Sequence, residues 1–346
     1  MTNKEIEKQN ELKLKKPLVY NKVIKYNDKV NRGESIAIVR LEYSGICPFN
    51  CTHCSARDMM AKKVDKFIAP NDVKNIYDQA DKLGLAHATI TGGNPDSFPD
   101  LEEVVKSIGP ERFYIAIDSN GWNLDKEKVK KIKQWGVDKV QLSLDSIIKE
   151  EHDKFRNKKG SYDKAIKAID YCLDNKLDLI LQTVVTKDRL YSQEFNDYLN
   201  FAKSKDISVF ATAAKPVGEF EGRYDLMLSI KDFDYLNSLS KDFTVFNHLT
   251  PSYGFNHGCV AVKKIITILK TFDVIPCQFV YCSIGNLLNE SLETILDRGM
   301  KLKPFKTNMC PVAVDKKFVE KYLVNRMRGK EIPVCYKEVF REEDFE

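Results

Sequence analysis

The chain has 346 residues, of which 43% are hydrophobic and 30% charged, and 55 basic against 50 acidic residues leave a net charge of +5. This composition is typical of a globular protein with room for one large domain and a smaller one. The small, diffuse positive charge gives no reason to expect nucleic acid as a partner. No apolar run approaches the roughly 20 residues of a membrane helix, and the N-terminal stretch MTNKEIEKQNELKLKKP lacks the apolar core of a secretory signal. We therefore expect a cytoplasmic protein without a membrane partner.

Residues 1–34 are polar and lysine-rich, and they predict a loosely held arm or a short edge element. From residue 35 onward strand and helix patterns alternate, which predicts a parallel sheet with functional residues at the carboxyl ends of its strands. After residue 228 this rhythm breaks, so we expect three regions: an arm in 1–34, an α/β core of six strand-helix units in 35–228, and a cysteine-bearing region in 229–346. The expected strands are 35–44, 86–91, 113–119, 139–145, 177–185 and 207–214, and the expected helices are 70–84, 100–108, 125–135, 162–173 and 192–204.

Three cysteines, Cys47, Cys51 and Cys54, follow the first expected strand with the spacing C-x3-C-x2-C. Nine cysteines in a chain without an export signal indicate metal ligation or catalysis rather than disulfides. Three thiolates can hold three irons of a 4Fe-4S cluster and leave the fourth iron open to a small chelating ligand. Zinc, with His53 or a distant residue as the fourth ligand, is the alternative at this point.

This loop resembles the signature of the radical S-adenosylmethionine (SAM) enzymes, in which the open iron binds the amino and carboxylate groups of the methionine moiety. The resemblance implies a partial (β/α)6 TIM-like barrel, with Cys47, Cys51 and Cys54 holding the SAM cluster. It also implies reductive cleavage of SAM to a 5′-deoxyadenosyl radical that takes a hydrogen atom from the substrate. The expected activity is that of a radical SAM oxidoreductase, supplied with electrons by a donor such as flavodoxin or ferredoxin.

Two later loops fall where the resemblance expects them. TGGNP, after the second strand, matches the GGEP motif that receives the methionine ammonium, although Asn94 stands where Glu is usual. The thirty or so residues from Gln141 look like the family pattern in which Ser143 and Asp145 contact the ribose or methionine carboxylate region and Arg156 pairs with that carboxylate. His53 would pack on the adenine, and the alternative is a solvent-facing loop histidine. For Asp145, the alternative is a helix N-cap. The implied cofactor-binding residues are His53, Gly92, Gly93, Asn94, Pro95, Ser143, Asp145 and Arg156.

The C-terminal region resembles the SPASM or shorter twitch domains that carry an auxiliary iron-sulfur cluster. Gly-Cys at Cys259 and Pro-Cys at Cys277 fit the first two ligands, whereas Phe272 stands where Gly usually opens the intervening turn. Cys172 is expected to be a buried small hydrophobe. We expect one auxiliary 4Fe-4S cluster, with structural zinc as the alternative. Four of five cysteines would bind it: Cys259, Cys277, Cys282, Cys310 and Cys335.

The substrate is the least determined feature. Lys215, Glu219 and Arg223, after the sixth strand, could face substrate at the barrel mouth, and a solvated loop is the equal alternative. With about 34 residues before the barrel, too few for a winged-helix peptide-recognition unit, a small molecule such as an amino sugar or nucleotide is favoured over a peptide. The auxiliary cluster would help to oxidise or rearrange it. A zinc-stabilised binding module and a two-cluster electron carrier are the other classes, and both leave the GGNP loop (residues 92–95) and the SLDS loop (residues 143–146) unexplained.

Overall fold

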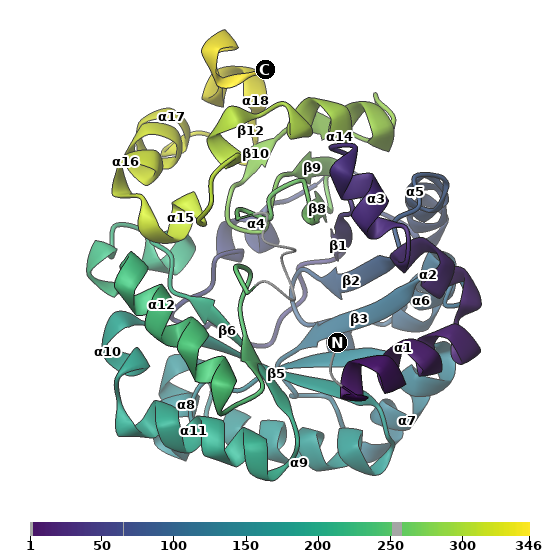
Figure 1. The fold of residues 1–346 in the computed structure, drawn as a ribbon, viewed down its shortest axis with the longest axis vertical. Coiled ribbons are helices and arrows are strands. Elements are labelled where there is room, and N and C mark those ends of the chain that lie inside the picture. Colours follow the sequence, from purple (N-terminus) through teal and green to yellow (C-terminus); the bar gives the residue numbers. More distant parts are fainter. Residues whose placement is uncertain (1–2, 65, 251–257) are drawn as a thin grey trace.

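A computed structural model describes residues 3–64, 66–250 and 258–346. Its main sheet has ten strands in the order β11-β9-β8-β1-β2-β3-β4-β5-β6-β7. The six central strands are parallel and neighbour one another in chain order, which confirms the predicted partial (β/α)6 barrel (Figure 1). These strands are β1 (Ile38–Glu42), β2 (His87–Thr91), β3 (Tyr114–Ser119), β4 (Lys139–Ser143), β5 (Asp178–Val185) and β6 (Ser208–Ala213).

The helices that connect the strands wrap around the outside of the sheet (Figure 1). Their starts follow ordinary capping chemistry: the side chain of Asp125 accepts from the backbone N–H of Lys128, and that of Ser192 accepts from Phe195. Within this core the helices are α4 (Arg57–Ala61), α5 (Pro70–Lys82), α6 (Leu101–Ile108), α7 (Lys126–Trp135), α8 (Lys149–Phe155), α9 (Ser161–Asp174), α10 (Lys187–Leu190) and α11 (Gln193–Ser204), and α12 (Ile230–Ser238) follows it.

The two faces of the sheet differ in polarity. On β4, Val140 and Leu142 point toward the helices and are fully buried, whereas Lys139, Gln141 and Ser143 alternate with them and are only partly buried. The apolar core therefore lies between the sheet and its surrounding helices, because that is where alternate strand residues meet the apolar helix faces. The inner face of the curved sheet instead surrounds a polar lumen.

The N-terminal region differs from the expected loose arm. It forms the helices α1 (Asn3–Lys15), α2 (Pro17–Val23) and α3 (Tyr26–Asn31), purple in Figure 1. The Lys22 ammonium donates to the backbone carbonyls of Leu85 (3.0 Å) and Arg112 (2.8 Å), and the buried hydroxyl of Tyr26 accepts from the backbone N–H of Ala86 at 2.8 Å. The lysines of this region led us to expect a solvated segment. Lys22 instead binds carbonyls in the loops that precede β2 and β3. The region covers the amino-terminal end of the barrel.

The cysteine-bearing region continues the main sheet across the expected boundary at residue 228. A short strand follows β6 in parallel at one edge, and another joins β1 in parallel at the other. Its strands are β7 (Val245–Phe246), β8 (Ile265–Leu269), β9 (Asp273–Ile275), β10 (Cys282–Ser283), β11 (Gly285–Asn286) and β12 (Val334–Cys335), of which β10 and β12 form a separate pair. Its helices are α14 (Leu292–Met300), α15 (Pro311–Val314), α16 (Lys316–Phe318), α17 (Asn325–Met327) and α18 (Tyr336–Val339), with a π-helical turn at Val319–Val324.

Phe272, which replaces the usual turn glycine, keeps the backbone conformation of a glycine. Its φ is +66°, and its backbone N–H donates to Leu269 at 2.8 Å to close the turn between β8 and β9. A bulky residue is rare in this left-handed region. Its ring is buried, and the Lys66 ammonium lies 4.7 Å from the ring centroid. The turn expected from the sequence is therefore retained despite the substitution.

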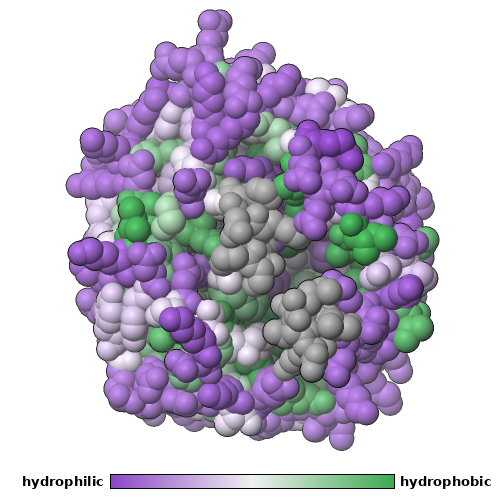
Figure 2. All heavy atoms as spheres, viewed as in Figure 1, coloured by the Kyte–Doolittle hydropathy of each residue, from purple (hydrophilic) through white to green (hydrophobic). Residues whose placement is uncertain are grey.

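The outer surface is largely hydrophilic, with separate hydrophobic patches on the face shown in Figure 2. Among the helices of the described residues, none combines the length and the apolar character that crossing a bilayer would require.

Candidate active site

The three closely spaced cysteines lie in the loop between β1 and α4, at the carboxyl ends of the barrel strands. They line one cavity of about 250 Å³ together with the implied cofactor-binding residues other than Pro95. Pro95 instead opens a buried 3-10 turn, Pro95–Ser97, behind that wall. The residues on the cavity wall that the sequence singled out are Cys47, Cys51, His53, Cys54, Gly92, Gly93, Asn94, Ser143, Asp145 and Arg156.

The cysteine loop and the GGNP loop are joined backbone to backbone. The N–H of Gly45 donates to Gly92 at 2.6 Å, and the N–H of Asn94 donates to Ile46 at 2.7 Å. At Gly93, with φ +107°, an added Cβ would lie 2.2 Å from the Ile46 carbonyl oxygen. The glycine pair therefore allows the cysteine loop to approach closely. It also leaves the backbone accessible from the cavity.

Asn94, which replaces the usual Glu, connects two strand-end loops. Its side chain donates to Asp96, and its Oδ1 accepts from the backbone N–H of Asn120 at 2.9 Å. Asp96 also accepts from the Ser119 hydroxyl at 2.6 Å, and burial raises the pKa of Asp96 to about 6. The SNG turn after β3 is thereby held against the GGNP loop.

Asp145 and Arg156 form a buried ion pair beside the cysteine loop. Arg156 Nη2 lies 2.6 Å from Asp145 Oδ2, and Arg156 Nη1 lies 3.9 Å from the sulfur of Cys51. Burial alone would raise the pKa of Asp145, yet the Arg156 guanidinium holds it below the usual range. The following helix, α8, begins at Lys149 with Ile148 as its N-cap. The N-cap alternative for Asp145 is therefore wrong.

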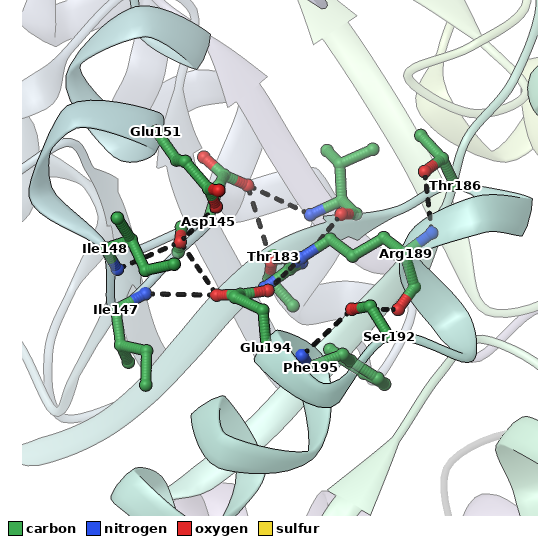
Figure 3. Close-up of polar contacts among 12 residues, drawn as sticks. Asp145, Ile147, Ile148, Glu151, Thr183, Thr186, Arg189, Ser192, Glu194 and Phe195 are labelled. Atoms are coloured by element: carbon green, nitrogen blue, oxygen red, sulfur yellow. Dashed lines mark hydrogen bonds and ion pairs between the residues drawn. The ribbon is translucent and has the colours of Figure 1, made fainter.

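A polar network holds Asp145 of this pair against the end of β5 (Figure 3). Asp145 Oδ1 accepts from the N–H of Val184 at 3.0 Å, and the carbonyl of Val184 accepts from Arg189 at 2.9 Å. Arg189 also pairs with Glu194 at 3.0 Å, and Glu194 accepts from the N–H of Ile147 at 3.2 Å. The ends of β4 and β5 are thus locked together, which positions Asp145 through several contacts.

The His53 ring is stacked on Phe155, with centroids 4.2 Å apart and an interplanar angle of 12°. Burial, reinforced by the charge of Arg156, lowers the pKa of His53 to about 3, so the ring is uncharged at neutral pH. Its Nδ1 is buried without a hydrogen-bond partner among the described residues. His53 is therefore partly buried, with its Nδ1 covered, and a neutral aromatic surface stands in the cavity wall.

Burial makes two of these cysteine thiols hold their protons more firmly than a free thiol does. Burial raises the pKa of Cys54 to about 11 and also raises that of Cys47, so ligation must displace their protons. Within the described ranges, no three His, Cys, Asp or Glu side chains converge closely enough to hold one metal ion.

The three catalytic candidates after β6 have separate surroundings. Arg223 is 55% exposed and pairs with Asp225 at 2.7 Å, as the solvated-loop alternative describes. Glu219 pairs with Arg57, and its N–H donates to the Cys54 carbonyl at 3.1 Å, so it ties its loop to the cysteine loop. Neither Arg223 nor Glu219 lines the described cavity.

Lys215 is buried between the cavity and a second group of cysteines. Its ammonium donates to the Ala213 carbonyl at 2.9 Å and lies 4.1 Å from the ring centroid of Phe279, a cavity residue. Burial lowers the pKa of Lys215, while the thiols of Cys310, Cys277 and Cys259 oppose that shift. Lys215 therefore lies within electrostatic reach of three cysteines.

The five C-terminal cysteines separate into three and two. Burial, and then the neighbouring thiols of Cys310 and Cys277, raise the pKa of Cys259 well above its usual range. Cys282 and Cys335 lie on the paired strands β10 and β12, and Cys335 is the residue whose thiol further raises the pKa of Cys282 after burial. Electrostatic influence thus links Cys259 with Cys277 and Cys310, and Cys282 with Cys335.

Residues 41–201 match the family model described as the radical SAM superfamily. This part of the chain is a radical SAM domain. The chain is 22% identical over 300 residues to the AdoMet-dependent heme synthase of Nitratidesulfovibrio vulgaris, spanning 78% of this chain and 81% of the synthase. It is 27% identical over 190 residues to the GTP 3′,8-cyclase of Clostridium perfringens, which spans 54% of this chain and 58% of the cyclase.

Solved structures share the fold of the radical SAM domain and of the region that follows it. SuiB of Streptococcus suis bound to S-adenosylmethionine superposes with a TM-score of 0.60 at 18% identity, covering 80% of this chain and 69% of SuiB. Native anSMEcpe with bound AdoMet gives a TM-score of 0.58 at 17% identity, covering 76% of this chain and 81% of its own. A radical SAM domain implies a 4Fe-4S cluster and SAM as cofactors.

Sequence reasoning missed two further wall residues of the radical SAM domain's cavity. Glu42, at the end of β1, is 5% exposed, and its Oε1 accepts from the Tyr281 hydroxyl at 3.1 Å. Burial raises the pKa of Glu42 to about 7. Gln278, next to Cys277, also lines the cavity. Its buried Oε1 has no hydrogen-bond partner among the described residues. A signal existed for Glu42, because polar residues alternate with apolar ones along β1.

Proposed function

We propose that Cys47, Cys51 and Cys54 hold the 4Fe-4S cluster of this radical SAM enzyme and that SAM binds in the adjoining cavity. The observation that carries the proposal is the convergence of the three thiols, the glycine pair and the Arg156 guanidinium on one space of about 250 Å³. When bound, the cluster supplies the electron that cleaves SAM to a 5′-deoxyadenosyl radical, which abstracts hydrogen from substrate.

The chain's own residues would bind and orient SAM. Arg156 carries a buried Nε without a partner among the described residues and stands between Cys51 and Asp145, where it can receive the methionine carboxylate. Ser143 and Asp145 border the same wall and would receive the ribose hydroxyls. His53, neutral and stacked on Phe155, offers an uncharged ring to the adenine.

We further propose one auxiliary 4Fe-4S cluster, held by Cys259, Cys277 and Cys310. The supporting observation is the mutual electrostatic influence of these thiols, with the buried Lys215 beside them to offset negative charge. Cys282 and Cys335 form their own pair on β10 and β12, which argues against their completing this site. Three thiolates leave one iron without a protein ligand, so the site is suited to bind and orient substrate.

The substrate we favour is a small molecule that enters the polar lumen, and it is either oxidised or rearranged. The lumen consists of two adjoining cavities of about 250 and 300 Å³, a size typical of small-molecule sites. The named activities of the heme synthase and the GTP cyclase are of the same kind. A peptide substrate is the alternative, because SuiB and anSMEcpe have each been solved with a peptide. The electron donor would be a flavodoxin or ferredoxin.

Metal content after anaerobic reconstitution tests the cluster assignments. We expect about eight irons per chain in the wild type, as two 4Fe-4S clusters require. Cys277→Ala should lose about half of the iron, whereas the matched variant Cys335→Ala should keep all of it. A colourless protein with bound zinc would contradict both assignments, and iron loss in Cys335→Ala equal to that in Cys277→Ala would contradict the three-cysteine site.

A further inference from the structure

Glu42 is a buried carboxyl group in the wall of the candidate SAM cavity that the proposed function leaves without a role. It ends β1, where it follows Arg40 on the face that borders the cavity. Its Oε1 accepts from the Tyr281 hydroxyl at 3.1 Å. Burial raises the pKa of Tyr281 well above its ordinary value, and Glu42 and the Cys54 thiol add to that shift. Glu42 therefore lies on the side of the cavity that the cysteine loop borders.

The charged side chains of this wall form two pairs and leave Glu42 over. Arg40 pairs with Asp118 and Arg156 pairs with Asp145, each at 2.6 Å. Glu42 forms no ion pair within the part of the chain that the structure describes. Burying a carboxyl group without a cationic partner is costly unless the group is protonated or a ligand compensates it. Apart from the cysteines, the charged residues described in the wall are Arg40, Glu42, Asp118, Asp145 and Arg156.

A ligand with the charges of SAM needs a negative partner in this wall. Its methionine end carries an amino group beside a carboxylate, and its sulfur carries a fixed positive charge, so positive groups outnumber negative ones. Arg156 would receive the carboxylate, as proposed above. The amino group then requires an acceptor, and a carboxylate that accepts from a charged donor forms one of the stronger hydrogen bonds in proteins.

Glu42 lies directly against the loop that follows β2. It is in register with Thr91, and an added Cβ at Gly92 would lie 2.4 Å from the Glu42 Cα, so the glycine lets β1 approach the GGNP loop closely. Asn94 of that loop already uses its Oδ1, which accepts from the backbone N–H of Asn120 at 2.9 Å. The acceptor that remains beside this loop is the carboxyl group of Glu42.

The surroundings of Glu42 allow a cationic group to change its protonation. Burial raises the pKa of Glu42 to about 7, the Tyr281 hydroxyl, Arg40 and Lys270 oppose that shift, and Asp118 adds to it. A cationic group placed next to the carboxyl would favour its charged form and lower the pKa. An α-amino group keeps its proton up to about pH 8, so the charged carboxylate and the protonated amino group coexist near neutral pH.

We infer that Glu42 accepts a hydrogen bond from the amino group of SAM, while Arg156 holds the carboxylate of the same methionine end. The inference rests on the proposed SAM site and adds to it a residue that lies outside both the C-x3-C-x2-C and the GGNP motifs. The Tyr281 hydroxyl positions the Glu42 carboxyl group. The region that follows the radical SAM domain thus takes part in binding SAM.

The test is calorimetric titration of the anaerobically reconstituted protein with three ligands. These are SAM, S-adenosylhomocysteine, which keeps the amino group but lacks the sulfonium charge, and 5′-methylthioadenosine, which lacks the amino group and the carboxylate. Near neutral pH, Glu42→Gln should bind SAM and S-adenosylhomocysteine about tenfold more weakly than the wild type does, and 5′-methylthioadenosine equally well. Glu127→Gln, at an exposed position of α7, is the matched control and should bind all three as the wild type does.

The pH dependence of SAM affinity is a second readout, which a merely structural role would not produce. Between about pH 6 and about pH 7.5 the wild type should gain affinity severalfold, because binding requires the carboxylate, and Glu42→Gln should lack this gain. Tyr281→Phe removes the hydroxyl that lowers the pKa of Glu42. It should therefore bind SAM more weakly than the wild type at neutral pH and approach wild-type affinity at higher pH.

Three results would overturn the inference. They are wild-type affinity of Glu42→Gln for SAM, weakening of SAM alone, which would place the carboxyl at the sulfonium, and equal weakening of 5′-methylthioadenosine, which would indicate a distorted cavity. Each of them leaves the proposed SAM site standing, because the wild type still binds SAM. Failure of the wild type to bind SAM would instead refute the proposed site and this inference with it.

Discussion

The two ends of the barrel lumen are built in different ways. At the carboxyl end, irregular loops provide the chemistry: the cysteine loop, the GGNP loop and the segment that carries Arg156 are joined by backbone hydrogen bonds and a buried ion pair. At the amino end, regular strand residues such as Lys139 face a cavity that α3 helps to close. The candidate SAM site therefore lies where short motifs are readable, whereas the cavity at the amino end is lined by strands that carry no motif.

The largest effect expected at the carboxyl end comes from breaking the Asp145–Arg156 pair. Arg156→Ala leaves a buried, uncompensated carboxylate and should lower the free energy of unfolding by about 3–5 kcal/mol. Arg156→Lys is the control, because it keeps the charge but loses the planar fork. Urea unfolding and SAM affinity should both separate the variants, with Arg156→Lys intermediate. Equal stability of Arg156→Ala and wild type would refute the structural role.

A slightly smaller effect is expected for Gly93→Ala. The new Cβ would lie 2.2 Å from the Ile46 carbonyl oxygen and displace the cysteine loop, at a cost of about 2–4 kcal/mol. Gly160 has a similar backbone, with φ +84°, but nothing lies within 4 Å of an added Cβ, so Gly160→Ala should cost only about 1 kcal/mol. Iron content after reconstitution should fall in Gly93→Ala alone. Equal loss in both variants would mean that backbone strain, rather than the clash, is responsible.

Glu42 should make stability depend on pH. Its folded pKa of about 7 lies above the ordinary 4.5, so the stability it contributes in the protonated form is lost as pH rises between these values. The wild type should lose up to about 3 kcal/mol across that range, and Glu42→Gln should lose less. Urea unfolding of both proteins on either side of neutral pH measures the difference. Parallel pH profiles for the two would contradict a buried, protonated Glu42.

The smallest effect is expected at the amino end. Lys22→Met removes the donor to the Leu85 and Arg112 carbonyls and should cost about 1–2 kcal/mol. Lys25→Met, at an exposed position before α3, should stay within about 0.5 kcal/mol of wild type. Thermal unfolding of the two variants would show whether the N-terminal helices are fixed by specific lysines or only lie against the barrel.

The sequence allowed the barrel and the cysteine loop to be predicted for different reasons. The alternation of apolar and polar residues along strands such as 139–145 indicates directly which side of the sheet is apolar. The C-x3-C-x2-C spacing lies within a single loop and can be read from a short stretch of sequence. The helical N-terminal region was not predicted, because its lysines find carbonyl partners far along the chain. Nor could spacing group Cys259 with Cys310, since that proximity depends on how the chain returns after β9.

The polar strand residues that line the lumen were not predicted either, for a related reason. Alternation indicates which residues of a strand share a face, as Lys139 and Gln141 do opposite Val140. It does not indicate which face borders a hollow interior or which residues of other strands complete the layer. That information arises from register between strands, as in the pairing of Ala116 with Lys139.

The central claim is that the loop of Cys47, Cys51 and Cys54 supports SAM cleavage. The most direct test measures 5′-deoxyadenosine formed from SAM by the reconstituted, chemically reduced protein, with Cys172→Ala, a buried thiol of α9, as the matched control for loss of a cysteine. We predict that the wild type and Cys172→Ala form the product and that Cys51→Ala forms none. Product formation by Cys51→Ala at the wild-type rate, or none by the wild type, would contradict this account.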